Sequence, residues 1–159
     1  MIDLDALDIR LLDLLQVDAS RANQALAEAA HASPATTLRR VRRLVEAGVI
    51  ERQVAIVSPQ QVPGLTALVE VSLDAQGAEH LQAFEACAIA EGLVQQCYRV
   101  SPGPDFMLVV WAPDMAAYHA LVQRLFTQDA NVRNVKAFFS VHRAKFEPRV
   151  KLAATDSPT

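Results

Sequence analysis

Residues 31–50 read HASPATTLRRVRRLVEAGVI, and this stretch decides how the first third of the chain is organised. Ser33 followed by Pro34 predicts the start of a helix, because a serine caps free backbone N–H groups and proline is tolerated at the first helical position. Gly48 predicts its end. At about 100° per residue, apolar side chains should face the interior and polar ones the solvent. The expected interior side holds Leu38, Val41, Leu44 and Val45, and the solvent side holds Thr36, Arg39, Arg40 and Arg43, with Arg42 on the flank.

Two helices are expected before this Arg-rich helix and a strand pair after it. Leucines at helical spacing predict a helix over residues 3–16, and an Ala-rich stretch predicts a second over 23–30. The segment VIERQVAIVSP, which begins at Val49, alternates and is rich in Val and Ile, as a short strand pair should be. Three helices of which the last is basic, followed by strands, indicate a winged helix-turn-helix.

An Arg-rich helix face suits DNA. Guanidinium groups neutralise phosphates and can bridge O6 and N7 of guanine, and the helix N-terminus itself favours a phosphate oxygen. Thr36 and Thr37 lie near that N-terminus. The alternative is a solvated face that happens to be rich in Arg. The DNA-binding interpretation requires the guanidiniums to be free, and it predicts that replacing Arg40 and Arg43 with alanine leaves folding intact and weakens DNA binding.

The remainder alternates strands and helices. Strands are predicted over residues 65–73, 94–101, 106–112 and 132–146, with one helix around residues 81–89 and another after Asp114. The order β-α-β-β-α-β is that of a ferredoxin-like unit, so the fold class is α+β. The predicted domains are a winged helix-turn-helix at 1–58, a hinge at 59–64, an α+β domain at 65–147 and a flexible tail at 148–159.

Charge is segregated along the chain, although the net charge is only −3. Residues 33–52 carry five Arg and two Glu, and residues 133–151 carry six bases and one acid. The second basic stretch is expected to face solvent; alternatively, it steers DNA around an assembled particle. Because pI describes the whole chain, it says little about a partner that touches one face.

Several other classes of protein are not supported. No apolar run reaches the ~18 residues that span a bilayer, and the acidic N-terminus does not resemble a secretory signal, so a cytoplasmic protein without membrane contact is expected. Cys87 and Cys97 are too few for a disulfide framework and are expected to be buried and inert. No His/Cys spacing suits zinc, no catalytic residues are predicted, and Trp111 is expected in the core.

Taken together, the motifs resemble the Lrp/AsnC (leucine-responsive, feast/famine) regulators over about residues 3–147. In the first domain the matching residues are Leu4, Asp5, Asp8, Asp18, Leu26, Ala27, Ser33, Pro34, Leu38, Arg39, Arg40, Val41, Arg43, Leu44, Gly48, Val49 and Ile50. In the second they are Val94, Cys97, Tyr98, Val100, Ser101, Asp105, Phe106, Leu108, Pro113, Asp114, Met115 and Tyr118.

The resemblance implies a sequence-specific regulator that binds double-stranded DNA, with an ACT-like (RAM-type) second domain. It implies homodimers that assemble into tetramers or octamers, no cofactor, and an amino acid or other small molecule as effector. Carried over, the DNA contacts would come from Ser33, Thr36, Thr37, Arg39, Arg40 and Arg43. The effector residues would be Ser101, Gly103, Asp105, Val135 and Ala137.

Two departures from the family pattern bear on function. The family's Gly-Asp-Tyr-Asp loop is replaced by Pro102-Gly103-Pro104-Asp105, and threonines of the last strand by Val135 and Ala137. These changes remove polar groups, so the effector is either more apolar or absent. In the helix-turn-helix, His31 replaces the turn glycine, and histidine tolerates a left-handed backbone better than most residues.

Two alternative functions remain. The same two-domain frame resembles decarboxylases of siroheme and haem-type tetrapyrroles, which would need basic groups in the α+β cleft; the loop at Asp105 is poor in bases. The second alternative is an architectural protein that packs the chromosome without sequence preference.

Overall fold

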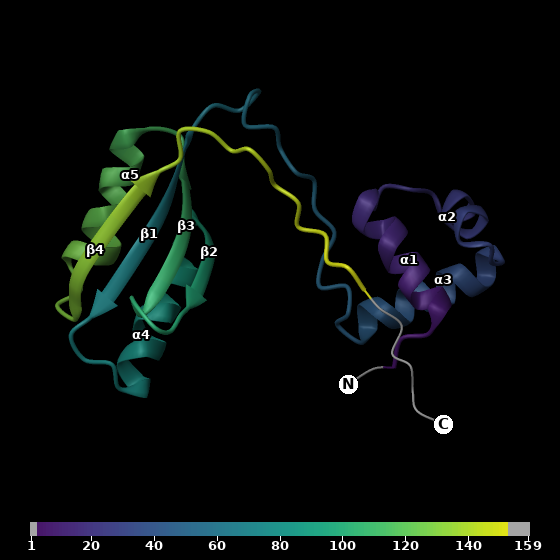
Figure 1. The fold of residues 1–159 in the computed structure, drawn as a ribbon, viewed down its shortest axis with the longest axis horizontal. Coiled ribbons are helices and arrows are strands. Elements are labelled where there is room, and N and C mark those ends of the chain that lie inside the picture. Colours follow the sequence, from purple (N-terminus) through teal and green to yellow (C-terminus); the bar gives the residue numbers. More distant parts are fainter. Residues whose placement is uncertain (1–2, 153–159) are drawn as a thin grey trace. The chain divides into compact units, whose positions relative to one another are not determined.

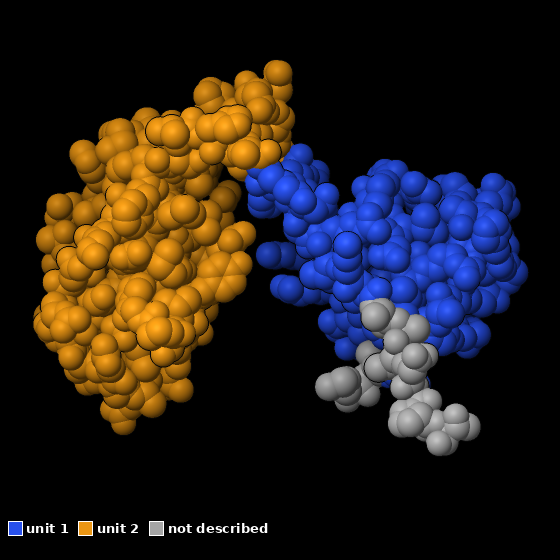
Figure 2. Space-filling view, in the orientation of Figure 1, with its two compact units in different colours: residues 1–56, 145–159 blue, residues 57–144 orange. Residues whose placement is uncertain are grey.

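The computed structural model describes residues 3–152, and its chain divides into two compact units (Figure 2). The first unit contains the residues up to Ile56 together with those from Lys145 onward, and the second contains Val57–Ala144. The ribbon shows helices alone in the first unit and a sheet with helices in the second (Figure 1). This is the α+β class, and apart from the strand pair expected after Gly48 the elements follow the order that the sequence predicts.

The first unit is a three-helix bundle. Helices α1 (Ala6–Val17), α2 (Asn23–Ala30) and α3 (Pro34–Glu46) bury a small core around Leu11, Leu26 and Ala30. Helix α1 begins with a capping box, in which the Asp5 carboxylate accepts from the Asp8 N–H and the Asp8 carboxylate accepts from the Asp5 N–H. The start of α1 is therefore specified by residues of its own first turn.

The turn between α2 and α3 has the predicted geometry. His31 is left-handed, with φ 54° and ψ 46°, so it takes the conformation that glycine usually supplies. Ser33 caps α3 by accepting the N–H of Thr36 at 3.2 Å, with Pro34 in the first turn. Gly48 ends α3 at φ 71°, and Val49 N–H reaches back to the Leu44 carbonyl at 2.9 Å. These three positions set where helix α3 begins and ends.

The strand pair predicted after Gly48 is wrong within this chain. Residues 51–58 form no strand and are exposed, including the apolar Val54 and Ile56. A strand needs a neighbour for its N–H and C=O groups, and nothing in the described chain pairs with this segment. The sequence of this segment therefore alternates between apolar and polar residues, but the structure shows no strand pairing there.

The second unit is built on a four-stranded antiparallel sheet in the order β2-β3-β1-β4. Its strands are β1 (Leu65–Leu73), β2 (Val94–Arg99), β3 (Phe106–Ala112) and β4 (Val132–Phe139). Helix α4 (Ala78–Ala90), α5 (Met115–Val122) and its π-helical continuation η1 (Gln123–Thr127) complete the unit. The ferredoxin-like topology is confirmed.

Both helices of this unit cover one face of the sheet (Figure 1). Val69 and Val71 of β1 pack with Phe84 of α4 and Leu121 of α5 in a single core. Trp111 lies on a strand whose buried side chains alternate with half-buried ones, and it belongs to the half-buried set. The prediction of a core position for Trp111 is therefore wrong, because strand alternation turns it to the face that the helices leave open.

Beyond β4 the chain returns to the first unit. The predicted strand to Phe146 ends at Phe139, because Ala67, near the start of β1, is its last partner. Gln16 of α1 exchanges two hydrogen bonds with the backbone of Val150, and Arg149 lies 3.5 Å from Asp13. The described part of the expected tail, residues 148–152, is thus tied to α1; residues 153–159 lie outside the described residues.

Gly64 provides a test of the open sheet face. A Cβ placed on it would lie 2.6 Å from the indole ring of Trp111, whereas one on Gly92 would meet nothing within 4 Å. We expect Gly64→Ala to lower the free energy of unfolding by about 1–3 kcal/mol through overpacking, and to shift the fluorescence of the chain's only tryptophan. Chemical denaturation followed by fluorescence measures both. Gly92→Ala is the matched control, and equal behaviour of the two variants would contradict the packing.

Candidate nucleic-acid interface

Helix α3 presents a different face from the one its periodicity predicts. Thr37 and Leu44 are fully buried, while Leu38 and Val45 are 41% and 50% exposed. Only Leu44 and the half-buried Val41 of the predicted interior set face the bundle. The prediction for Leu38 and Val45 is wrong because α3 is rotated so that part of its charged side faces α1.

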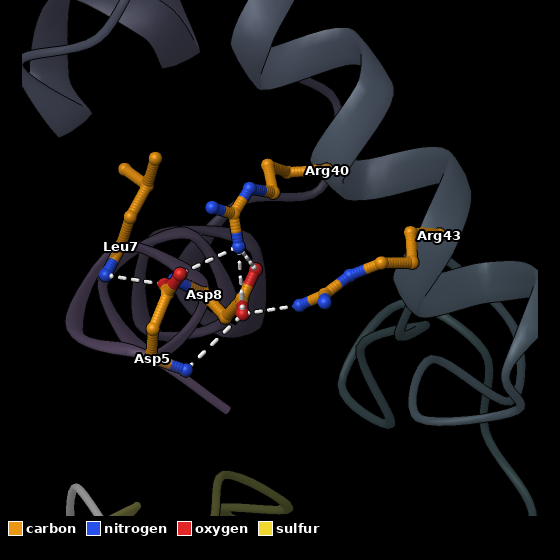
Figure 3. A network of polar contacts seen from close by, with 5 residues as sticks. All are labelled: Asp5, Leu7, Asp8, Arg40 and Arg43. Atoms are coloured by element: carbon orange, nitrogen blue, oxygen red, sulfur yellow. Dashed lines mark hydrogen bonds and ion pairs between the residues drawn. The ribbon is translucent and has the colours of Figure 1, made fainter. Parts of the chain in front are cut away.

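Two of the arginines that were expected to face solvent point back to α1 (Figure 3). The Arg40 Nη1 atom donates to Asp5 Oδ2 at 2.6 Å and lies 3.2 Å from Asp8 Oδ2. Arg43 Nη2 donates to the same Asp8 oxygen. Asp8 is fully buried, so removal of both arginines would leave an unpaired buried charge, which typically costs about 3–5 kcal/mol. The structure therefore does not support the expectation that replacing them leaves folding intact.

The network shifts the pKa values of Asp5 and Arg40 in the direction that keeps both groups charged. The pKa of Asp5 lies below its ordinary value, first because the Asp8 N–H donates to its carboxylate and also because Arg40 does. The hydrogen bond to Asp5 raises the pKa of Arg40. Both groups are consequently charged throughout the neutral range, and the pair persists there.

The outward side of α3 carries a smaller cationic surface than predicted. Arg39 and Arg42 are exposed and form no ion pair with a described residue. Near the N-terminus, Ser33 is exposed and Thr36 is half-buried, with Ser33 Oγ donating to Thr36 Oγ1 at 2.9 Å. Thr37 is buried, so its side chain cannot contact DNA in this fold. We call Ser33, Thr36, Arg39 and Arg42 the outward face.

Sequence reasoning missed the role of Asp8, although a signal was present. Asp8 lies four residues after Leu4 and three before Leu11, so it shares their side of α1. An acidic residue on an apolar stripe requires a buried partner. The nearby arginine-rich helix was the available source of that partner.

Two of the expected effector residues, Asp105 and Val135, lie beside Val71 in the second half of β1, and Ala137 pairs with Val69 in its middle. Asp105 N–H donates to the Val71 carbonyl at 2.9 Å, and Val71 pairs with Val135 on its other side. The Asp105 carboxylate accepts from Leu73 N–H at 2.7 Å and from Gln76 at 3.3 Å. These bonds are structural, so one of the two oxygens of Asp105 already holds the β1 terminus. Ser101, Gly103 and Ala137 are exposed.

The remaining polar candidates are the two cysteines and the second basic stretch. Cys87 is exposed, against expectation, whereas burial raises the pKa of the half-buried Cys97. Among residues 3–152 no group of three or more metal-ligating side chains occurs, and no helix is long and apolar enough to cross a bilayer. In the second basic stretch, Arg133 and Lys136 are exposed, as expected for a solvent-facing strand.

The fold and its outward helix define a class of protein, and comparison with known families agrees. Residues 4–51 match the family model for winged helix-turn-helix DNA-binding domains. Residues 66–150 match that of the Lrp/AsnC ligand-binding domain. The two matches correspond to the two halves of the observed element order, so the chain is a helix-turn-helix regulator with a ligand-binding-type second domain.

Relatives of similar length support the same assignment. An HTH-type transcriptional regulator of Haemophilus influenzae is 37% identical over 150 residues, covering 94% of this chain and 89% of that protein. The leucine-responsive regulatory protein of Rhizobium meliloti is 33% identical over 152 residues, covering 95% and 97%. The crystal structure of an AsnC family regulator from Agrobacterium tumefaciens superposes with a TM-score of 0.84 at 30% identity, covering 92% and 96%.

A regulator from Neisseria meningitidis solved as a complex with L-Met has a TM-score of 0.83 at 26% identity, covering 92% of this chain and 96% of that one. The chain belongs to the Lrp/AsnC family of transcriptional regulators.

Thr37 distinguishes the observed orientation of α3 from the predicted one. Its Oγ1 is buried and has no hydrogen-bond partner among the described residues. We expect Thr37→Val, which keeps the shape, to raise the free energy of unfolding by about 1 kcal/mol and leave DNA binding unchanged, because an unsatisfied buried hydroxyl is removed. Thr36→Val is the matched control and should weaken DNA binding. Denaturation and fluorescence-anisotropy titrations measure the two effects; weaker binding by Thr37→Val would contradict the burial.

Proposed function

We propose that this regulator binds specific DNA sequences through the outward face of α3. Arg39 and Arg42 supply exposed guanidiniums without a counterion among the described residues, and Ser33 and Thr36 stand at the helix N-terminus, where a phosphate is favoured. The observation that carries the proposal is this exposed pair of arginines on the second helix of a helix-turn-helix. Arg40 and Arg43, which the sequence alone would include, act mainly inside the bundle.

A dimer places two such helices on half-sites about one helical turn apart. Assembly into larger homo-oligomers, which the sequence resemblance implies, would multiply weak half-site contacts through effective concentration. A specific regulator and an architectural protein differ in the ratio of their affinities for a promoter fragment and for bulk DNA. Competition of a promoter fragment against bulk DNA at fixed salt separates them, because only the regulator discriminates strongly.

The outward face can be tested by removing its two arginines. We expect Arg39→Ala/Arg42→Ala to weaken DNA binding by about tenfold or more and to reduce the slope of log K against log salt by up to about 2. The melting temperature should stay close to that of the parent, since neither side chain has an internal partner. Anisotropy titrations over a range of salt concentrations measure the slope.

The matched control is Arg133→Ala/Lys136→Ala, which removes the same charge from β4. Its DNA binding should equal that of the parent, in keeping with a solvent-facing strand. If the control lost binding and the α3 variant did not, DNA would run along the second basic stretch instead. A direct test of the decarboxylase alternative is a Soret shift on mixing with siroheme, which a regulator should not produce.

We further propose that the effector is an apolar amino acid. The support is the replacement of polar residues by Pro102, Pro104, Val135 and Ala137, together with the L-Met complex of the Neisseria relative. The acidic group at Asp105 remains, but its Oδ2 already binds Leu73 and Gln76. Such a site favours an aliphatic or thioether side chain over a charged one.

Thermal-shift measurements test this proposal. L-methionine should raise the melting temperature and L-aspartate should not, because only a ligand that binds the native state stabilises it. Ala137→Arg, which puts a bulky charge beside the expected site, should abolish the shift. If no amino acid shifts the melting temperature, the altered loop has lost effector binding.

A further inference from the structure

The buried carboxylate of Asp8 is the centre of a cluster of four charged side chains. Its Oδ2 lies 3.2 Å from the Asp5 N–H nitrogen, 3.2 Å from Arg40 Nη1 and within hydrogen-bond distance of Arg43 Nη2 (Figure 3). Arg40 Nη1 also contacts Asp5. Two carboxylates and two guanidiniums therefore neutralise each other at the contact between α1 and α3.

This neutralisation divides the arginines of α3 into two pairs. Arg40 and Arg43 direct their charged ends toward α1, and the Nε atoms of both are buried. Arg39 and Arg42 have no carboxylate partner in the described part of the chain and are exposed. Yet the side chains of Arg40 and Arg43 are still 22% and 42% exposed, so their charged ends are near enough to solvent to reach a phosphate once released.

The number of free guanidiniums determines how strongly a helix binds DNA regardless of sequence. Each phosphate contact contributes about 0.9 to the salt slope and adds affinity for every duplex equally. Specificity depends on the base contacts that remain when this uniform attraction is limited. An internal counterion for half of the arginines of α3 thus lowers non-specific affinity for DNA. The same arginines still pack in the bundle.

We propose that Asp8, assisted by Asp5, is a positioning residue for DNA recognition, which withholds Arg40 and Arg43 from the phosphate backbone so that Arg39 and Arg42 read the duplex. The inference rests on the proposed DNA-binding function. Under this proposal α1 contributes only acidic side chains to the cluster, and through them it controls the sequence discrimination of α3.

The test compares three isosteric changes on or beside α1 that each remove one negative charge. Asp8→Asn releases Arg43 and leaves Arg40 held by Asp5 alone, whereas Asp5→Asn leaves Arg40 held by Asp8 alone and keeps a good helix cap. Asp13→Asn is the matched control, because Asp13 pairs with Arg149 and not with α3. Each is titrated with a mixed-sequence duplex over about 50–200 mM salt, and with a duplex enriched from a random pool by the parent protein.

For Asp8→Asn we expect the salt slope on mixed-sequence DNA to steepen by about 1–2, and for Asp5→Asn by about 1 or less, relative to Asp13→Asn. Affinity for mixed-sequence DNA at low salt should rise, and the preference for the enriched duplex should fall. A purely structural role of Asp8 would give a lower melting temperature and weaker binding with an unchanged slope. That result would overturn the proposal.

If Asp8→Asn does not fold, Arg40→Gln decides the question, because Asp8 keeps its pair with Arg43 and an arginine withheld from phosphate contributes nothing to the salt slope. A slope for Arg40→Gln shallower than that of the parent protein would then refute the positioning role. Failure of the DNA-binding proposal looks different: the parent protein itself would bind neither duplex.

Discussion

The carboxylate of Asp8 is the group on which the DNA-binding unit depends. A buried acid is tolerated only when charged donors surround it, and here the donors come from α3. Because Arg40 and Arg43 must meet Asp8, α3 is rotated so that Thr37 and Leu44 face inward and Leu38 and Val45 outward. One electrostatic requirement on α1 therefore sets which side of the recognition helix is available to a partner.

Local signals in the sequence predicted most of the fold. Ser33-Pro34 and Gly48 marked the limits of α3, His31 was correctly expected in a left-handed turn, and strict alternation located β1 and β3. These features are encoded within a few neighbouring residues, through caps, backbone conformation and pleat. The structure confirms these predictions from local chemistry, but not the strand pair that alternation predicted after Gly48.

Features that require a distant partner were harder to predict. The strand expected up to Phe146 stops at Phe139, which pairs with Ala67 near the start of β1, and the segment after Gly48 pairs with no residue of the described chain. The orientation of α3 failed for the same reason, since periodicity does not record that Asp8 competes for the arginines. For the candidate site, the helix and its outward Arg39 were predictable, but the separation of the four arginines into two pairs was not.

The return of residues 149 and 150 to α1 has a consequence for biogenesis. Domains usually fold in the order in which they leave the ribosome, N-terminal first. Here the helical bundle is synthesised first, yet the surface of α1 around Asp13 and Gln16 is covered only after β4 has been translated. The DNA-binding unit is thus started first and completed last, so a nascent chain that stalls before this point carries the bundle without its final covering segment.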